Sequence, residues 1–400
     1  MTGRAANTGS RSSAAVGTDS SSKERMDEKC FRELLGVKRV IAFSYARHAL
    51  VSALKGAGLR KGDEVLLSPL TCKVVPLAIM SVGLVPRYVD IAQGTLNLDP
   101  MLAAKTIGDR TRAVVFQHTY GLSEGLAEIR SVARKNRLLL VEDRAQCMPV
   151  RGDEEGVMPE FGVAIYSNNL RKPLPASAGG LAATNDVKLA REIRRFRDRM
   201  SERTLVEEVA LRGAAYIHDW CVGPRTYWIL YEAARMISSV HRDRGLVREI
   251  RSEILQPAKI PSKWQETRAL AWAARANRLA ERRRGNTAYY AERLAGVPGL
   301  ETVRVAPDAP LFYFPVLTDL KHRCVAMARR RLLELVAWPI VLPIYPVKVR
   351  AHLDHYNYPM GSCPRAETVA QRLIGLPTDE TITDAHRKSL VDLLVRIHGC

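Results

Sequence analysis

The sequence lacks long apolar runs and closely spaced cysteines, and each absence excludes a class of protein. Its seven cysteines, at positions 30, 72, 147, 221, 324, 363 and 400, form no Cys-x-x-Cys pair and have no histidine cluster nearby. This argues against structural zinc and a disulfide framework, so we expect reduced thiols and no metal. No uninterrupted apolar stretch is long enough to span a bilayer, and the N-terminal residues lack the apolar core of a signal peptide. We therefore expect a cytoplasmic protein without a membrane partner.

The composition is globular, with an excess of basic residues. Hydrophobic residues make up 46% and charged residues 26% of the 400 residues, and the formal net charge is +19. The basic residues gather in helix-like stretches that have neither interleaved aromatic residues nor a known nucleic-acid motif. We interpret them as solvated surface rather than a nucleic-acid site. In a second interpretation, the charge attracts a phosphorylated small substrate.

Short, mostly aliphatic runs alternate with helix-like segments in the first half of the chain. The runs lie at 65–67, 84–90, 113–116, 138–141 and 163–166. This alternation predicts an α/β fold with a mostly parallel sheet covered by helices on both faces.

The pattern along the chain also predicts its division into domains. Residues 1–28 have no periodic apolar face and are expected to be a disordered tail. Residues 29–255 are expected to form a large cofactor-binding α/β domain that includes a helical insertion at 203–257. Residues 256–400 are expected to form a smaller C-terminal α+β domain.

Two residues that follow these runs carry the expected chemistry. Lys172 lies in a Pro- and Gly-containing loop after the run 163–166, and Asp143 closely follows the run 138–141. In α/β proteins, ligands bind beyond the carboxyl ends of parallel strands. Pyridoxal 5′-phosphate (PLP) requires a lysine amine for a Schiff base and a carboxylate that keeps the ring nitrogen protonated. We therefore predict Lys172 and Asp143 as catalytic residues and PLP as the cofactor.

With these residues in place, the chain resembles the DegT/DnrJ-type family of PLP-dependent sugar aminotransferases from about residue 40 to the end. The resemblance implies the fold-type I architecture, with a mostly parallel large domain and a smaller α+β domain. The motifs that carry it occur in the family's order: Gly62-Asp-Glu-Val65, Pro86 to Ile91, Asn97-Leu-Asp99, His118-Thr-Tyr120-Gly121, Val141 to Gln146, Ser167 to Gly180, Cys363 to Glu367 and Leu376-Pro377.

The resemblance implies a role for several positions. Lys172 would hold PLP and move the proton during the reaction, Asp143 would pair with the pyridinium nitrogen, and Gln146 would pack near the ring. His118 and Tyr120 belong to a matching motif near the active site and are possible site residues. Family members that dehydrate sugars have His in place of the lysine, so Lys172 favours amino transfer.

Three departures from the family pattern bear on function rather than fold. Ser167 would bind the phosphate together with Ala46 and Arg47 at a helix start, but the family's usual Ser-Gly-Thr is here Tyr-Ala-Arg. Arg47 is expected to compensate as a fork-shaped phosphate ligand. Cys72 occupies the position of the aromatic residue expected to stack on the ring. The Gly-x-Asn-x-Arg segment that reaches the neighbouring subunit is absent around 257–263.

Each assignment has a structural alternative when it is taken alone. Lys172 is then ordinary surface charge, Asp143 caps a helix, His118 is a satisfied core histidine, and Ser167 is a plain turn residue. The functional interpretation is favoured because all these alternatives would have to hold together.

We expect an aminotransferase that moves an amino group, from glutamate, to a keto group of a nucleotide-linked sugar or similar polyol. An anionic keto-sugar and an amino donor would be its small-molecule partners, and a homodimer its active unit. One alternative is a fold-type I PLP enzyme of specialised metabolism with chemistry other than transamination. The other is a degenerate, non-catalytic binding protein.

Overall fold

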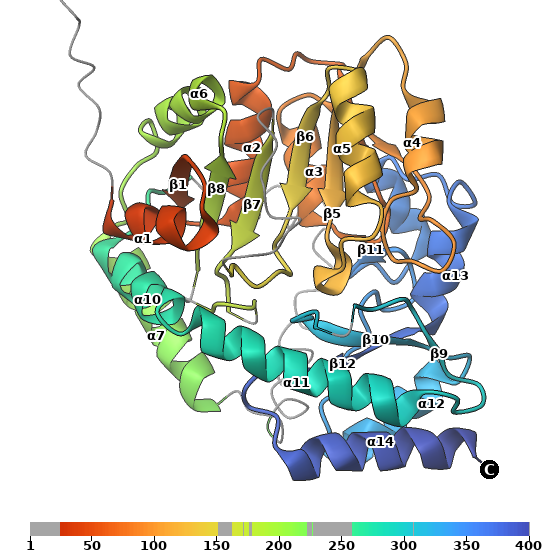
Figure 1. Ribbon diagram of the computed structural model, residues 1–400. Helices are drawn as coiled ribbons and strands as arrows, with labels where there is room; N and C mark the ends of the chain where they lie inside the picture. The colour runs from red at the N-terminus through yellow and green to blue at the C-terminus, as the bar shows by residue number, and fades with distance from the viewer. Residues whose placement is uncertain are drawn as a thin grey trace, which may run out of the picture.

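The computed structural model in Figure 1 describes residues 25–150, 162–170, 172–175, 178–221, 226, 258–306 and 308–399. At its centre lies a seven-stranded sheet with the order β1-β8-β7-β6-β5-β2-β4. Its strands are β1 (Arg39–Phe43), β2 (Glu64–Leu67), β4 (Val85–Tyr88), β5 (Thr111–Gln117), β6 (Leu139–Asp143), β7 (Val163–Ser167) and β8 (Gly180–Thr184). Strand β8 runs antiparallel to both neighbours, and the other pairs are parallel. The prediction of an α/β fold with a mostly parallel sheet is therefore confirmed.

Helices cover both faces of this sheet because successive side chains of each strand point to opposite faces. In β1, Ile41 and Phe43 pack with helices α2 (Ala46–Gly56), α3 (Val74–Ser81) and α6 (Val187–Arg197) on one face. Val40 and Ala42 pack on the other face with α1 (Met26–Leu35) and α10 (Lys263–Ala273). Farther along that second face, α4 (Pro100–Thr106) and α5 (Leu126–Lys135) complete the cover.

Residues of the C-terminal part that the structure describes form a smaller lobe around a three-stranded antiparallel sheet, with the order β12-β10-β9. Figure 1 shows the long helix α11 extending from α10 along this sheet toward α12 and α14. A short parallel pair, β3 and β11, joins the lobe to the loop after β2. Helix α7 (Leu205–Cys221) lies beside α10. The remaining elements of the structure are β3 (Thr71–Cys72), β9 (Glu301–Thr302), β10 (Tyr313–Leu317), β11 (Ile344–Tyr345), β12 (Leu373–Pro377), α11 (Ala276–Leu294), α12 (Lys321–Arg330), α13 (Pro364–Arg372) and α14 (Asp384–His398), with 3-10 turns at Thr119–Gly121 and Arg350–Tyr356.

The expected division into domains stays a prediction, and the packing of two helices differs from it in detail. Helix α1 begins at Met26, inside the tail expected at 1–28, and Glu28 is buried. Helix α10 packs with Phe31 against the large sheet, although it follows the boundary expected at residue 256. Of the expected insertion at 203–257, the structure describes α7 and little else. In the described residues, no helix is both long enough and apolar enough to cross a bilayer.

Candidate active site

A cavity of about 180 Å³ opens at the carboxyl ends of β6 and β7. Asp143 ends β6, Ser167 ends β7, and Lys172 reaches the cavity from the loop that follows β7. The predicted site residues that line this inner cavity are Ala46, Arg47, Cys72, Asp143, Gln146, Ser167 and Lys172. The structure thus brings the predicted lysine and carboxylate together, at the sheet edge where α/β proteins bind ligands.

Asp143 is held in place by the strand and by the turn that follows. It pairs in register with Gln117 of β5, and its Oδ1 accepts a hydrogen bond of 3.1 Å from the backbone N–H of Ala145. Burial raises the pKa of Asp143, while that hydrogen bond and the charge of Lys172 offset part of the increase. A carboxylate with a raised pKa is a good acceptor for a cationic N–H, since desolvation strengthens the attraction.

Lys172 stands between two cavities. Its backbone N–H donates to the carbonyl of Asn169 at 3.1 Å, and its Nζ lies 5.8 Å from the centre of the Phe312 ring in the small lobe. The residue lines the inner cavity and also an outer cavity of about 410 Å³. A group on Lys172 is therefore accessible from both sides.

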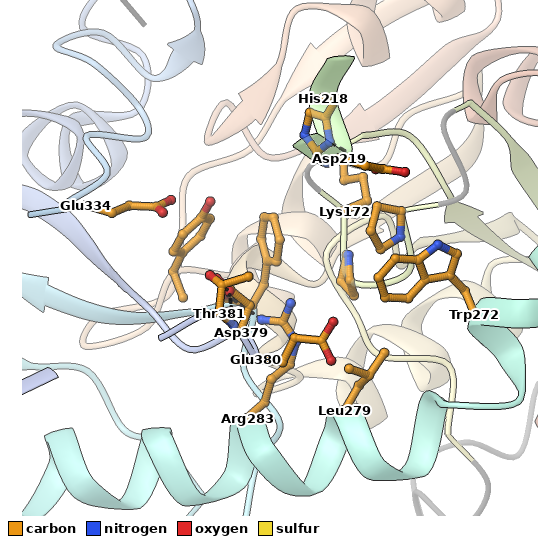
Figure 2. A pocket seen from close by; sticks show the side chains of 14 residues that line it. Lys172, His218, Asp219, Trp272, Leu279, Arg283, Glu334, Asp379, Glu380 and Thr381 are labelled. Carbon is orange, nitrogen blue, oxygen red and sulfur yellow. Dashed lines mark hydrogen bonds and ion pairs between the residues drawn. The ribbon is translucent and has the colours of Figure 1, made fainter. Parts of the chain in front are cut away.

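Figure 2 shows the outer cavity, which lies between the two lobes. Its lining includes two short segments that each contain a carboxylate, 218–219 at the end of α7 and 379–381 after β12, together with aromatic rings. The labelled lining residues are Lys172, His218, Asp219, Trp272, Leu279, Arg283, Glu334, Asp379, Glu380 and Thr381. Two of the carboxylates pair with arginines outside the lining, Asp219 with Arg268 at 2.8 Å and Glu380 with Arg275 at 3.0 Å.

The N-terminus of α2 closes one end of the inner cavity. Tyr45 precedes the helix with extended backbone and makes no side-chain cap, and the first turn contains no acidic residue. A Cβ on Gly180 would lie 2.3 Å from the backbone N of Ala46, so only glycine lets the helix start this close to the sheet. Ser167 is the register partner of Gly180. This helix start therefore has the features of an anion-binding site, because the positive end of the helix dipole favours negative charge.

Gln146 and Tyr120 join the inner cavity to the small lobe. Gln146 lines the cavity, and its Oε1 accepts a 2.7 Å hydrogen bond from the backbone N–H of Tyr120. Tyr120 is buried with a left-handed φ of 58°, and its hydroxyl donates to the carbonyl of Trp338 at 2.7 Å. The backbone N–H of Phe312 donates to the Tyr120 carbonyl. Tyr120 does not line either cavity, and its contacts hold the two lobes together.

His118 lies outside the lining of both cavities. Its Nε2 is 3.4 Å from Oε2 of Glu142, which also pairs with Arg130 and Arg144 at 2.8 Å. Burial lowers the pKa of His118, with the nearby Arg144 acting in the same direction. Burial alone would raise the pKa of Glu142, but the hydrogen bond from His118 and the arginine charges hold it well below its usual range. His118 is thus a buried neighbour of a charged network outside the two cavities, and its role as a site residue stays a prediction.

Cys72 lies at the inner cavity where the two lobes meet. Strand β3 pairs it with Tyr345 of β11, and burial raises the pKa of its thiol. Lys172 and Asp143 are both close enough to act on that thiol electrostatically, in opposite directions. Among the described lining residues, Tyr45 supplies the aromatic ring.

Sequence reasoning missed several residues of the site. Gln117 and Asn169 line the inner cavity. Gln117 could have been predicted, because it is a polar residue at the end of the aliphatic run that forms β5. The outer cavity had no local signal, since its residues come from segments far apart in the sequence.

Comparisons with known proteins agree with this architecture. The model of the DegT/DnrJ/EryC1/StrS aminotransferase family matches residues 16–214 and 269–395, and the unmatched stretch contains most of the expected insertion. The spore coat polysaccharide biosynthesis protein SpsC of Bacillus subtilis is 33% identical over 172 residues, which cover 43% of this chain and 44% of that protein. A dTDP-3-amino-3,4,6-trideoxy-alpha-D-glucose transaminase of Streptomyces venezuelae is 28% identical over 82% of this chain and 75% of its own length.

The first curated relatives are matched over less than half of their own length. A solved structure shares the fold over nearly the whole chain. NtdA from Bacillus subtilis, with bound cofactor PMP, superposes with a TM-score of 0.70 at 17% identity, covering 94% of this chain and 76% of that one. The fold is that of the fold-type I PLP aminotransferases. Because the family match spans most of the sequence, this chain belongs to the DegT/DnrJ/EryC1/StrS aminotransferase family.

Proposed function

We propose that the protein is a PLP-dependent aminotransferase that moves an amino group, from glutamate, to a keto group of a nucleotide-linked sugar or similar polyol. The observation that carries the proposal is the shared cavity of Lys172 and Asp143 at the carboxyl ends of β6 and β7. Membership of an aminotransferase family supports it. The relative from Streptomyces venezuelae is named for an amino sugar carried on dTDP, which supports this acceptor class.

The residues of the inner cavity fit PLP. Lys172 would bind it covalently through Nζ, and Asp143 would accept the hydrogen bond of the protonated ring nitrogen. Ser167 and the start of α2 would hold the phosphate, where Gly180 leaves room for the close approach of helix and sheet. When bound, the cofactor supplies an electron sink for carbanion character next to the transferred nitrogen.

The chain's own groups then account for the proton chemistry. Lys172 lines both cavities, so its amine would lie between the cofactor and the acceptor. From there it would take a proton from one carbon of the reacting group and return it to a neighbouring carbon. Asp143 would keep the ring nitrogen cationic throughout, because its buried carboxylate is stabilised by that positive charge. The interlobe walls would exclude water from the reacting atoms.

The outer cavity is the proposed place of the acceptor's sugar or polyol ring. Carboxylates such as Asp219 and Asp379 accept hydrogen bonds from hydroxyl groups, and Trp272 and Phe312 offer apolar surface to a ring. The excess of basic residues on the chain would attract an anionic acceptor such as a nucleotide-linked sugar.

A homodimeric active unit and a cytoplasmic location stay predictions.

The test compares purified protein with its Lys172→Ala variant, and uses Lys188→Ala, an exposed lysine of α6, as the matched control. We expect a visible absorption band with PLP in the parent and the control, trapped by borohydride on Lys172, and no such band in Lys172→Ala. Adding glutamate without an acceptor should then change the spectrum. A band that no amino acid changes would favour other PLP chemistry, and a protein that forms no band would favour the non-catalytic alternative.

A further inference from the structure

Two nitrogen atoms of the Arg203 guanidinium are enclosed and have no hydrogen-bond partner among the described residues. They are Nε and one terminal nitrogen, Nη2, and both are shielded from solvent. The side chain as a whole is half-buried. An enclosed charged donor without an acceptor opposes folding, and a bound anion is one partner that would satisfy it.

The position of Arg203 links it to the start of α2. Its guanidinium carbon lies 5.7 Å from the centre of the Tyr45 ring, and that of Arg47 lies 4.5 Å from the same ring. Tyr45 and Arg47 both line the inner cavity. His48, in the first turn of α2, adds no charge, because burial and the two guanidinium groups lower its pKa to about 4. Arg203 itself does not line the inner cavity, but its charge and that of Arg47 both lie beside Tyr45 and close enough to His48 to lower its pKa. Two positive charges therefore lie beside the start of α2, whose dipole is also positive there.

Arg203 is placed there by a segment that precedes α7. The backbone N–H of Ile260 donates to the carbonyl of Ser201 at 3.1 Å, and the Oγ of Ser44 donates to the carbonyl of Ile260 at 3.0 Å. The segments around 201 and 260 are thus tied to each other and to the residue before Tyr45. Sequence positions that are far apart meet at the end of the cavity where α2 begins.

We propose that Arg203 is a second cationic anchor for the cofactor phosphate, and that it acts with Arg47 from within the same chain. This rests on the proposed PLP function and assigns the phosphate end of the site to a residue outside the motifs of the sequence analysis. An anion at the start of α2 would supply the acceptor that these enclosed nitrogen atoms lack. Charge-assisted hydrogen bonds of this kind are stronger than neutral ones, and Arg offers a fork that suits phosphate.

The experiment compares PLP with pyridoxal, which has the same ring and aldehyde but no phosphate. Both are titrated against the apoprotein of the parent, Arg203→Ala, Arg203→Lys and Arg199→Ala, and the covalent adduct at Lys172 is followed by absorbance. Arg199 is an exposed arginine near the end of α6 and serves as the matched control. We expect Arg203→Ala to raise the Kd for PLP about tenfold, as for loss of one charged hydrogen bond, and to leave the Kd for pyridoxal within about twofold. Arg203→Lys should recover part of the loss.

A second readout separates ligand binding from a structural role. Because two guanidinium nitrogen atoms lack an acceptor, Arg203→Ala should leave the thermal stability of the apoprotein equal or higher, while PLP should stabilise this variant less than the parent. Equal weakening of PLP and pyridoxal binding, or an unchanged Kd for PLP, would overturn the assignment. Failure of the proposed function gives a different result, since the parent protein itself would then form no adduct with either aldehyde.

Discussion

Gly180→Ala is the substitution for which the structure predicts the sharpest effect. Gly180 begins β8, and β1 and β7 flank it at Phe43 and Ser167. A Cβ added there would lie 2.3 Å from the backbone N and 2.4 Å from the Cα of Ala46. Backbone atoms cannot rotate away as a flexible side chain does, so either the start of α2 or the end of β8 must move.

The size of the effect follows from that geometry. Ordinary van der Waals contacts begin near 3.4 Å, so the helix start must shift by about 1 Å. Extra atoms in a well-packed site typically cost about 1–3 kcal/mol, and an unyielding backbone neighbour places this case at the upper end. The same shift would displace the first-turn N–H groups from the proposed phosphate site. We therefore expect a lower free energy of unfolding and at least a tenfold higher Kd for PLP.

The assay is urea unfolding of the apoprotein together with PLP titration, with Gly108→Ala as the matched control. A Cβ on Gly108 would meet no atom within 4 Å, and that residue has no left-handed φ. Its replacement should therefore change stability by less than about 0.5 kcal/mol and leave PLP binding unaltered. If Gly180→Ala unfolded at the same urea concentration as Gly108→Ala, the close packing of α2 on β8 would be refuted.

Two further predictions concern buried charge. Glu142→Ala leaves Arg144 and Arg130 without the carboxylate that both contact, so the free energy of unfolding in urea should fall by about 3–5 kcal/mol. A decrease below about 1 kcal/mol would contradict a buried network. His48 has a folded pKa lowered to about 4, so the unfolded chain binds its proton first and stability falls as the pH decreases from about 6.5 to about 4. This component, up to roughly 3 kcal/mol, should disappear from the pH profile of His48→Asn, and an unchanged profile would exclude it.

Much of the large sheet was predictable because buried parallel strands leave a plain signal. The runs at 113–116 and 163–166 became β5 and β7, since aliphatic residues that pack on both faces give short continuous runs. Strands β1 and β8 were missed. Strand β1 begins at Arg39, only a short turn after helix α1 ends at Leu35. Strand β8 is built mainly from small residues, Gly-Leu-Ala-Ala-Thr, which carry little β preference.

The apolar residues between 262 and 294 recur at helical spacing and predict one long helix, but the structure has two helices here. Helix α10 ends at Ala273 and α11 begins at Ala276, with Arg275 at φ −100° and ψ −3° between them. The break lets α10 pack on the large sheet while α11 continues to the small lobe. A periodic apolar pattern cannot reveal such a change of packing partner, because both helices present apolar residues at the same spacing.

The candidate site was predictable to the extent that its residues end strands or follow them closely. Asp143, Ser167 and Lys172 meet this condition, and topology alone gathers them at one edge of the sheet. Arg203 does not, since its place beside Tyr45 depends on how the segments near 201 and 260 return to the sheet. Long-range placement of this kind leaves no trace in local spacing.

Lys172 separates two cavities of different origin, and that separation is itself testable. The inner cavity is built mainly from the large sheet and α2, whereas Asp379 approaches the outer one from the small lobe. Asp379→Asn removes a charge with little change of shape and keeps an oxygen for the hydrogen bond from the backbone N–H of Thr381. If hydroxyl groups of the acceptor bind this carboxylate, the KM for the acceptor should rise several-fold while the Kd for PLP stays within about twofold. A lower KM would mean that a negatively charged part of the acceptor occupies the outer cavity. Equal changes in both constants would mean that the two cavities are not independent, and the assignment of one to the cofactor and the other to the acceptor would fail.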